Sequence, residues 1–99
     1  DEATGRRLAE TLVTERLAAC VQVLGELTAI YRWEGKVESG TERLCLLKTV
    51  AARRPELERR LRELHPYAVP QIVALQAEAV SAAYLAWVVA ETKPPEENP

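Results

Sequence analysis

The stretch from Ala18 to Val50 constrains the fold most, because it has the pattern of one long β-hairpin. Its first half, AACVQVLGELTAIYRWEGK, is rich in β-branched and aromatic residues, which favour strands. Gly25 predicts a bulge or kink in this strand, and Glu34-Gly35 predicts a turn. A second strand, Lys36 to Val50, pairs back across that turn, with an irregularity expected near Gly40. The segment therefore predicts two long antiparallel strands.

Helical patterns flank the hairpin. Glu2 to Leu17 places apolar residues at helical spacing with charges between them. The segment RRPELERRLRELHPY has Pro55 in its first turn and leucines along one face, and its helix is expected to end at His65 because the residue before Pro66 disfavours helix. Its interleaved arginines and glutamates predict an exposed face with ion pairs. Ser81 is the expected N-cap of a third helix.

A short apolar strand, QIVALQAEA (71–79), is predicted between the last two helices. The resulting order is a ferredoxin-like, split βαββαβ α+β sandwich with an extra C-terminal helix and without its opening strand. That strand lies in the middle of such a sheet, so its loss would leave backbone groups unpaired. We therefore expect an apolar strand ahead of Asp1, or a replacement for it. Residues 1–92 are expected to form a single domain, and 93–99 a flexible tail.

Composition excludes several classes of protein. A chain of 99 residues supports one modest core, which oligomerisation would help to stabilise. With 47% hydrophobic residues, 28% charged residues and a net charge of -2, neither disorder nor a nucleic-acid partner is indicated. No apolar run approaches the roughly 18 residues of a membrane-spanning helix, and no secretory signal is visible. A cytoplasmic location without a membrane partner is the simplest prediction.

Several motifs in order resemble the CutA family of divalent-cation tolerance proteins. They are LAACVQV, AIYRWEGKV, LKT, LHPYAVPQIVAL and YLAW, and together with their spacing they cover about nine-tenths of the chain. The resemblance implies a ferredoxin-like subunit of a tight homotrimer, similar to the PII signalling proteins. It also implies a non-enzymatic role in tolerance of divalent metals, copper especially, with no cofactor required.

The sequence departs from the family pattern at several positions, with Gln at 22, 71 and 76 and Val at 80 where other residues are usual. Gln71 replaces a carboxylate expected beside His65. A carboxylate is the group that would complete a hard metal site or orient an imidazole. Metal binding is therefore less firmly predicted for this chain than for the family.

Cys20 and His65 are the candidate metal ligands. A Cys20 thiolate would suit Cu(I) where subunits meet, and the alternative is a small buried residue at a helix-to-strand junction. His65 is the only histidine, so a site with several histidines would need several copies; otherwise its ring caps the helix end or packs under Tyr67. Cys45 alternates with core leucines and is expected in the core.

Five residues are candidates for a ligand cleft or an interface between subunits: Tyr31, Trp33, Glu34, Lys48 and Tyr67. Tyr31 and Trp33 alternate with Arg32 and should share one strand face. Lys48 is a charge at the end of an apolar strand, where a partner carboxylate or a small anion is expected. Our preferred hypothesis pairs it with Glu34 of another subunit.

Two other classes of function compete with the metal-responsive trimer. One is a PII-like trimer that binds a small ligand or a partner in its clefts, which Lys48, Trp33 and Tyr67 would suit. The other is an enzyme or an RNA-binding module on the same fold. The sequence lacks the arginine-bearing glycine loop of an acylphosphatase, a basic character suited to RNA, and any Ser-His-Asp or Cys-His grouping. A catalytic role is therefore not predicted.

Overall fold

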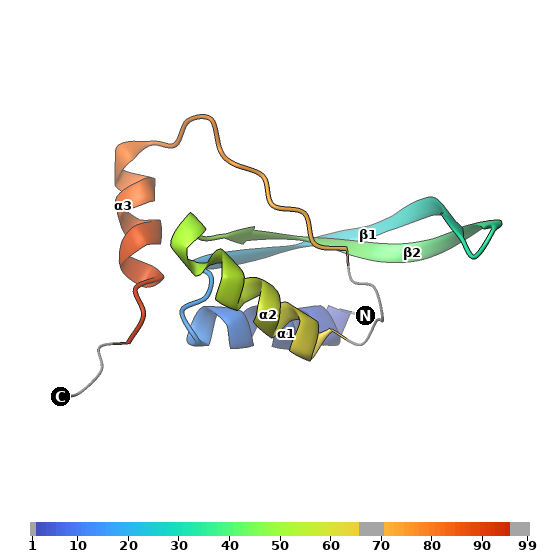
Figure 1. Ribbon diagram of the computed structural model, residues 1–99, viewed down its shortest axis with the longest axis horizontal. Coiled ribbons are helices and arrows are strands. Elements are labelled where there is room, and N and C mark those ends of the chain that lie inside the picture. The colour runs from blue at the N-terminus through green and yellow to red at the C-terminus, as the bar shows by residue number, and fades with distance from the viewer. Residues whose placement is uncertain (1, 66–70, 96–99) are drawn as a thin grey trace.

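The chain forms a long two-stranded antiparallel hairpin, with two helices along one face of its base and a third helix at its end (Figure 1). This arrangement is seen in a computed structural model that describes residues 2–65 and 71–95. Its elements are α1 (Glu2–Thr14), β1 (Cys20–Trp33), β2 (Lys36–Lys48), a 3-10 turn (Ala51–Arg53), α2 (Arg54–Leu64) and α3 (Ala82–Glu91). The order and the placement of α1 and α2 confirm the predicted ferredoxin-like α+β class.

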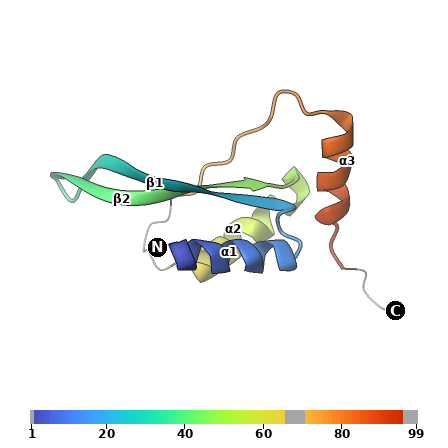
Figure 2. The same ribbon diagram turned by 180° about the vertical axis from the view of Figure 1, so that it is seen from behind.

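The hairpin extends well beyond the helices. The two strands pair from Cys20↔Lys48 to Trp33↔Lys36, and Figure 2 shows that their outer half projects past α1 and α2 as an arm. The predicted turn is confirmed, with Glu34 at φ 49 and Gly35 at φ 78. The irregularity predicted near Gly40 is wrong, because Gly40 pairs regularly with Ala29. The one irregularity in the ladder lies between Val23 and Glu26, where Gly25 predicted it.

The core lies between the base of the hairpin and the two helices. Leu12 of α1, Leu57 and Leu61 of α2, and Leu17 after α1 form one buried cluster, against which Val21 and Leu47 of the strands pack. The spacing of the leucines places them on one face of each helix. Pro55 stands in the first turn of α2, and His65 is its C-cap, both as predicted.

Arginines hold the helix ends together. Arg16, with φ 60, ends the turn that follows α1. Its Nη1 donates to the carbonyls of Ala90 and Glu91, both at 3.3 Å, and so ties the end of α3 to the end of α1. Arg53 is buried and ion-paired with Glu56 at 3.1 Å. Its Nε donates to the Arg16 carbonyl at 3.4 Å. These contacts fix the end of the molecule where β1 begins.

The strand predicted over 71–79 is not formed. Residues 71–80 run between α2 and α3 without a helix or a ladder partner, although Ile72 packs against the core cluster. An extended segment becomes a strand only when a neighbour accepts and donates its backbone hydrogen bonds. Among the described residues, no strand lies beside residues 71–80 to do so. No helix within the described residues is long and apolar enough to span a membrane.

Candidate functional site

The face of the hairpin that points away from α1 and α2, which we call the helix-free face, carries half-exposed apolar side chains, with charged residues opposite several of them. Three strand side chains point toward the helices. Val21 and Leu47 pack against the core cluster, and the Val23 Cγ1 lies 3.5 Å from a Cβ built at Gly5 of α1. Because side chains alternate along a strand and paired residues share a face, the remaining residues of each strand can be assigned to the opposite face. Its large apolar residues, each 38–46% exposed, are Leu24, Leu27, Tyr31, Trp33, Leu44 and Leu46.

The bulge at Gly25 assigns these residues to the same face. Val23 pairs with Cys45, and the next pair is Glu26 with Arg43, so Leu24 and Gly25 together oppose the single residue Leu44. The extra residue reverses the alternation in the outer half of β1. Leu27, Tyr31 and Trp33 therefore lie on the face of Leu24, rather than on the face of Val21 and Val23.

Tyr31 and Trp33 share the helix-free face, and Arg32 lies on the other, as their alternation predicts. The Tyr31 ring lies against Gly40 of the neighbouring strand, where a built Cβ would approach its Oη to 3.4 Å. That separation is an ordinary van der Waals distance, so a Cβ at position 40 would touch the Tyr31 ring without displacing it.

The two cysteines lie on opposite faces. Cys20 pairs with Lys48 on the helix-free face, whereas Cys45 pairs with Val23 on the helix side. Both thiols are free and half-buried, and burial raises the pKa of the Cys45 thiol. The two thiols cannot form an intrachain disulfide in this fold, because side chains on opposite faces of the sheet point apart. Cys20 is therefore the thiol that a second subunit could reach.

His65 lies far from Cys20. It caps α2, donating its backbone N–H to the Leu61 carbonyl at 2.8 Å. β1 begins near the first residues of α2, whereas α2 ends at the opposite end of the helix layer (Figure 1). A helix of 11 residues is about 16 Å long. The two candidate ligands therefore belong to different sites within one chain.

A single chain does not assemble a metal site from its described residues. Nowhere in residues 2–65 and 71–95 do three His, Cys, Asp or Glu side chains gather closely enough to hold an ion. One thiol and one distant imidazole do not fit a resident metal. Within the described residues, Cys20 has no companion ligands from its own chain.

Lys48 and Glu34 are at opposite ends of the hairpin. Glu34 is in the turn at the tip of the arm, and Lys48 closes the base opposite Cys20. They cannot pair within one chain, so the predicted ion pair requires two copies. Tyr67 lies outside the described residues.

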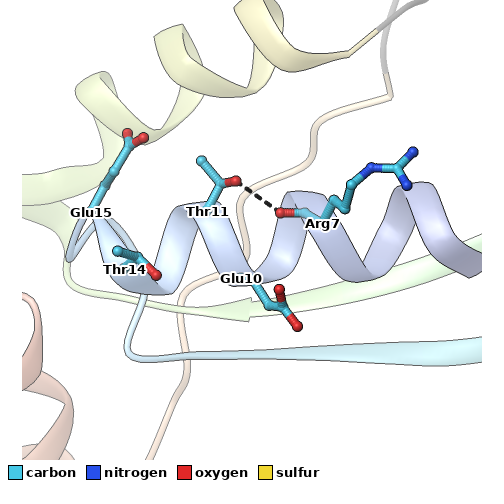
Figure 3. Close-up of a pocket in the computed structure, with 5 residues that line it drawn as sticks. All are labelled: Arg7, Glu10, Thr11, Thr14 and Glu15. Atoms are coloured by element: carbon cyan, nitrogen blue, oxygen red, sulfur yellow. Dashed lines mark hydrogen bonds between the residues drawn. The ribbon is translucent and has the colours of Figure 1, made fainter.

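A hollow of about 390 Å³ lies along α1 and is lined by Arg7, Glu10, Thr11, Thr14 and Glu15 (Figure 3). The Thr11 hydroxyl donates to the Arg7 carbonyl at 2.9 Å, so it serves the helix backbone. None of the predicted site residues lines this hollow, and it faces solvent on the surface of the helix layer.

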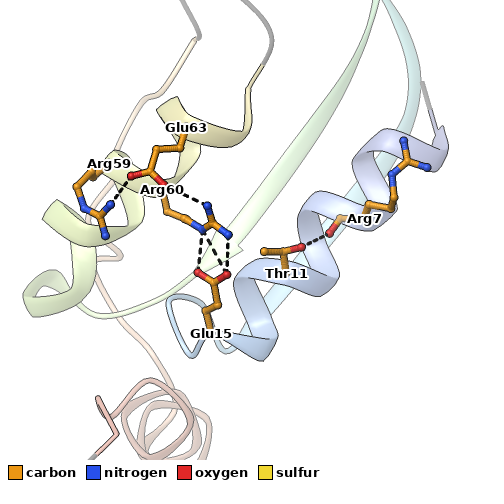
Figure 4. A network of polar contacts seen from close by, with 6 residues as sticks. All are labelled: Arg7, Thr11, Glu15, Arg59, Arg60 and Glu63. Atoms are coloured by element: carbon orange, nitrogen blue, oxygen red, sulfur yellow. Dashed lines mark hydrogen bonds and ion pairs between the residues drawn. The ribbon is translucent and has the colours of Figure 1, made fainter.

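A polar network joins the two helices across that surface (Figure 4). Arg60 of α2 donates to both carboxylate oxygens of Glu15, with Nε–Oε1 at 2.9 Å and Nη2–Oε2 at 2.8 Å, and also to Glu63 at 3.1 Å. Glu63 accepts from Arg59 as well. The hydrogen bond from Arg60 lowers the pKa of Glu15 below its ordinary value, and the same bond raises the pKa of Arg60. The arrangement stabilises the packing of α1 against α2.

The residues that sequence reasoning missed are the leucines of the helix-free face. Leu24, Leu27, Leu44 and Leu46 read as ordinary strand residues, and their common face depends on the extra residue at Gly25. The sequence did contain a signal for this face, because Gly25 predicted a bulge at that point. Carrying the alternation through that bulge would have placed them beside Tyr31 and Trp33.

Comparison with known proteins gives one consistent result. The family profile described as "CutA1 divalent ion tolerance protein" matches residues 1–91. The divalent-cation tolerance protein CutA of Thermus thermophilus is 47% identical over 87 residues, which are 88% of this chain and 84% of that protein. Protein CutA of Mus musculus is 39% identical over 88 residues, or 89% of this chain, and the chain spans 50% of its length. The solved structure of the divalent cation tolerance protein from Thermus thermophilus superposes with a TM-score of 0.90 at 45% identity, covering 94% of this chain and 90% of that one.

Proposed function

The chain belongs to the CutA1 divalent ion tolerance family, and from that premise we propose that it acts as a non-enzymatic homotrimer in tolerance of divalent metal ions, copper in particular.

The helix-free face is the observation that carries the proposed assembly. Six large apolar side chains along one ribbon stay 38–46% exposed in the single chain. Exposed apolar side chains gathered on one face mark an interaction site, and the charged ladder partners beside them, such as Glu38 opposite Tyr31, would lie at its rim. Closed cyclic symmetry would cover the same face on every copy. Three hairpins packed by these faces would add buried apolar surface to the small core of each chain.

Helix α3 supports the same proposal. Its sequence, AAYLAWVVAE, carries no charge before its last residue. A helix that is apolar all round is normally buried. Here Val88 is buried, whereas Tyr84, Leu85, Trp87 and Val89 are 40–47% exposed. The proposed assembly would cover these side chains with the neighbouring copy.

The metal proposal rests on where Cys20 lies. Its thiol is on the helix-free face, so the proposed packing would direct one thiol from each copy toward the others. Thiolates are soft ligands that suit Cu(I). Cys45 points into its own subunit, and its raised pKa keeps it protonated. Because the thiol must stay reduced, we place this function in the cytoplasm.

The two cysteines provide a matched test. Purified protein is titrated with Cu(I) in competition with a chromogenic chelator, using wild type, Cys20→Ser and Cys45→Ser. Loss of a thiolate ligand should weaken binding at least about tenfold in Cys20→Ser, about 1.4 kcal/mol per factor of ten, while Cys45→Ser binds as wild type. Unchanged Cu(I) affinity in Cys20→Ser would remove that residue from the site.

We also propose that residues of the arm take part in the contacts between copies. Tyr31 and Trp33 would pack between copies, and Lys48 at one base would meet Glu34 at the tip of another arm. Single reversals, Lys48→Glu and Glu34→Lys, should weaken the trimer, and the double reversal should restore it. Equal weakening by the double reversal would contradict the pairing. No cluster within the described residues favours the alternative PII-like ligand sensor.

A further inference from the structure

A hollow of about 440 Å³ lies at the base end of the molecule, where α3 stands beside the end of α1 and the start of β1. Val13, Ala18 and Ala19 form an apolar wall of this hollow, and Trp87 and Glu91 of α3 line its other side. Trp87 is 44% exposed in the single chain. An aromatic ring and a carboxylate thus lie together beside an apolar wall, open to a partner.

The charges around this hollow favour a cation. Glu91 forms no ion pair with any of the described residues. Arg16 also lines the hollow, but its Nη1 donates to the carbonyls of Ala90 and Glu91, which carry the partial negative charge of a helix end. The Glu91 carboxylate therefore remains for another cation, and the face of the Trp87 ring beside it attracts one as well.

The tip of the arm carries a matching cation. Lys36 begins β2 opposite Trp33, and neither Lys36 nor Glu34 in the turn forms an ion pair within residues 2–65 and 71–95. At the base, Lys48 is likewise unpaired within this part of the chain, as Glu91 is. The tip and the base therefore present opposite charges in two matching pairs. Figure 1 shows that they lie at opposite ends of the hairpin, so they cannot meet within one chain.

We propose that the hollow is a socket for the arm tip of a neighbouring copy, and that the Lys36 ammonium of that copy binds between the Glu91 carboxylate and the ring of Trp87. The proposal rests on the proposed trimer, and it adds a second charge pair to the Glu34–Lys48 pair at the same contact. Each copy has one tip and one socket, so three identical contacts close a ring.

The positions of the charges allow one tip to meet both base residues. The backbone N–H of Ala19 donates to the Lys48 carbonyl at 2.8 Å, so Lys48 adjoins the hollow that Ala19 lines. At the tip, only Gly35 separates Glu34 from Lys36 in the sequence. Lys36 shares the helix-free face with Trp33, because the two are ladder partners. The face proposed to pack between copies is thus the one that carries this ammonium.

Both sides of the contact are ordered before they meet. Glu34 and Gly35 form a tight turn, with φ 49 and 78, so the tip has little backbone freedom to lose. On the other side, the ring of Tyr84 lies 5.6 Å from the ring of Trp87 and supports it. Preorganised partners lose less entropy when they associate. The socket therefore suits a rigid tip better than a flexible chain end.

Exchange of the two charges is the first test. Lys36→Glu and Glu91→Lys should each weaken the trimer at least about tenfold, because like charges then face each other across the contact. The double variant should recover most of this loss, since the pair is restored in reverse. Glu78→Lys makes the same charge change outside the hollow and should assemble as wild type. The trimer dissociation constant is measured by light scattering over a series of chain concentrations.

The exposure of Trp87 to the neutral quencher acrylamide is the second test. Trp33→Phe leaves Trp87 as the only tryptophan, and all samples carry this background. At concentrations where the mass is that of three chains, Lys36→Ala should lose much of the protection that Trp87 has in the trimer. Leu46→Lys, which places a charge on the helix-free face and should give single chains, supplies the fully accessible reference.

The outcomes separate the socket from the trimer. A protein with the mass of three chains would overturn the socket alone if Lys36→Ala left Trp87 as protected as before. A double variant weakened by the sum of the two single losses would also overturn it. Protection of Trp87 already present in single Leu46→Lys chains would show that the chain closes its own hollow, against the proposal. A mass of one chain for wild type would overturn both the trimer and the socket.

Discussion

The ring of Tyr31 lies against Gly40 of the neighbouring strand, with its Oη 3.4 Å from the place where a Cβ would stand at Gly40. The partner of Gly40 in the ladder is Ala29, so Tyr31 reaches it diagonally across the same face. Strand alternation and the bulge at Gly25 place the Tyr31 side chain on the helix-free face, where a second subunit could meet it.

Tyr31→Ala should therefore destabilise the arm. Loss of a cross-strand aromatic contact costs roughly 0.2–1 kcal/mol, and loss of interface area would add to this in an assembled protein. Urea unfolding at a fixed chain concentration measures the change. Arg32→Ala, on the opposite face, is the control and should stay within about 0.5 kcal/mol of wild type. Equal effects of the two substitutions would contradict the role given to Tyr31.

A substitution in the turn at the tip of the arm should stabilise the chain. Glu34 and Gly35 both have positive φ, 49° and 78°, as a type I′ turn requires. A side chain such as Glu is strained in this region, while Asn tolerates it. We expect Glu34→Asn to stabilise the chain by about 1 kcal/mol or less, and Gly35→Ala to destabilise it by about 1–2 kcal/mol. Thermal unfolding of both variants tests the signs, and a gain in Gly35→Ala would refute the turn assignment.

The Glu15–Arg60 pair predicts a pH dependence. The hydrogen bond from Arg60 holds the pKa of Glu15 below its ordinary value of 4.5. The unfolded state therefore binds this proton more readily, so the contribution is fully present above about pH 4.5 and is lost as pH falls through the lower folded pKa. The midpoint difference between wild type and Glu15→Gln should stay constant from pH 7 to 5 and narrow below 4.5.

Glu10→Gln is the control for this pH series, because Glu10 pairs with Arg6 on the same exposed helix face. Its effect on the midpoint should be small at every pH. A difference between wild type and Glu15→Gln that persisted unchanged to pH 3 would show that the Arg60 contact does not carry the effect.

Deleting Gly25 tests the bulge. Without the extra residue, the outer half of β1 shifts by one position, and Leu27, Tyr31 and Trp33 move to the helix side. We expect the variant to lose assembly while keeping helical content in circular dichroism. Gly25→Ala retains the residue count, and nothing lies within 4 Å of a Cβ there, so it should assemble as wild type. Normal assembly of the deletion variant would contradict the assignment of faces.

The fold class and most element positions could be predicted from sequence because they depend on local signals. Leucine spacing and Pro55 predicted α2, and Glu34-Gly35 predicted the turn. Gly40 misled because a strand glycine often marks a bulge, whereas here it pairs regularly with Ala29. The strand over 71–79 could not be decided locally, since it depends on a partner strand elsewhere.

The candidate site was less accessible to sequence reasoning. Alternation correctly placed Tyr31 and Trp33 on one face, but the face of the leucines required the exact register of the bulge. The separation of Cys20 from His65 follows from how α2 lies over the sheet, which no local pattern encodes. Contacts between copies are harder still to predict, because the sequence does not distinguish a leucine in an interface from a leucine in the core.

The mass of the assembled protein tests the account most directly. Light scattering after size-exclusion chromatography should give three times the mass of one chain for wild type. Leu46→Lys, which places a charge on the helix-free face, should give one chain, while Ile30→Lys should remain trimeric, because Ile30 is 75% exposed on the opposite face of the arm. A wild-type mass of one chain, or a trimer that survives Leu46→Lys, would contradict assembly through the helix-free face.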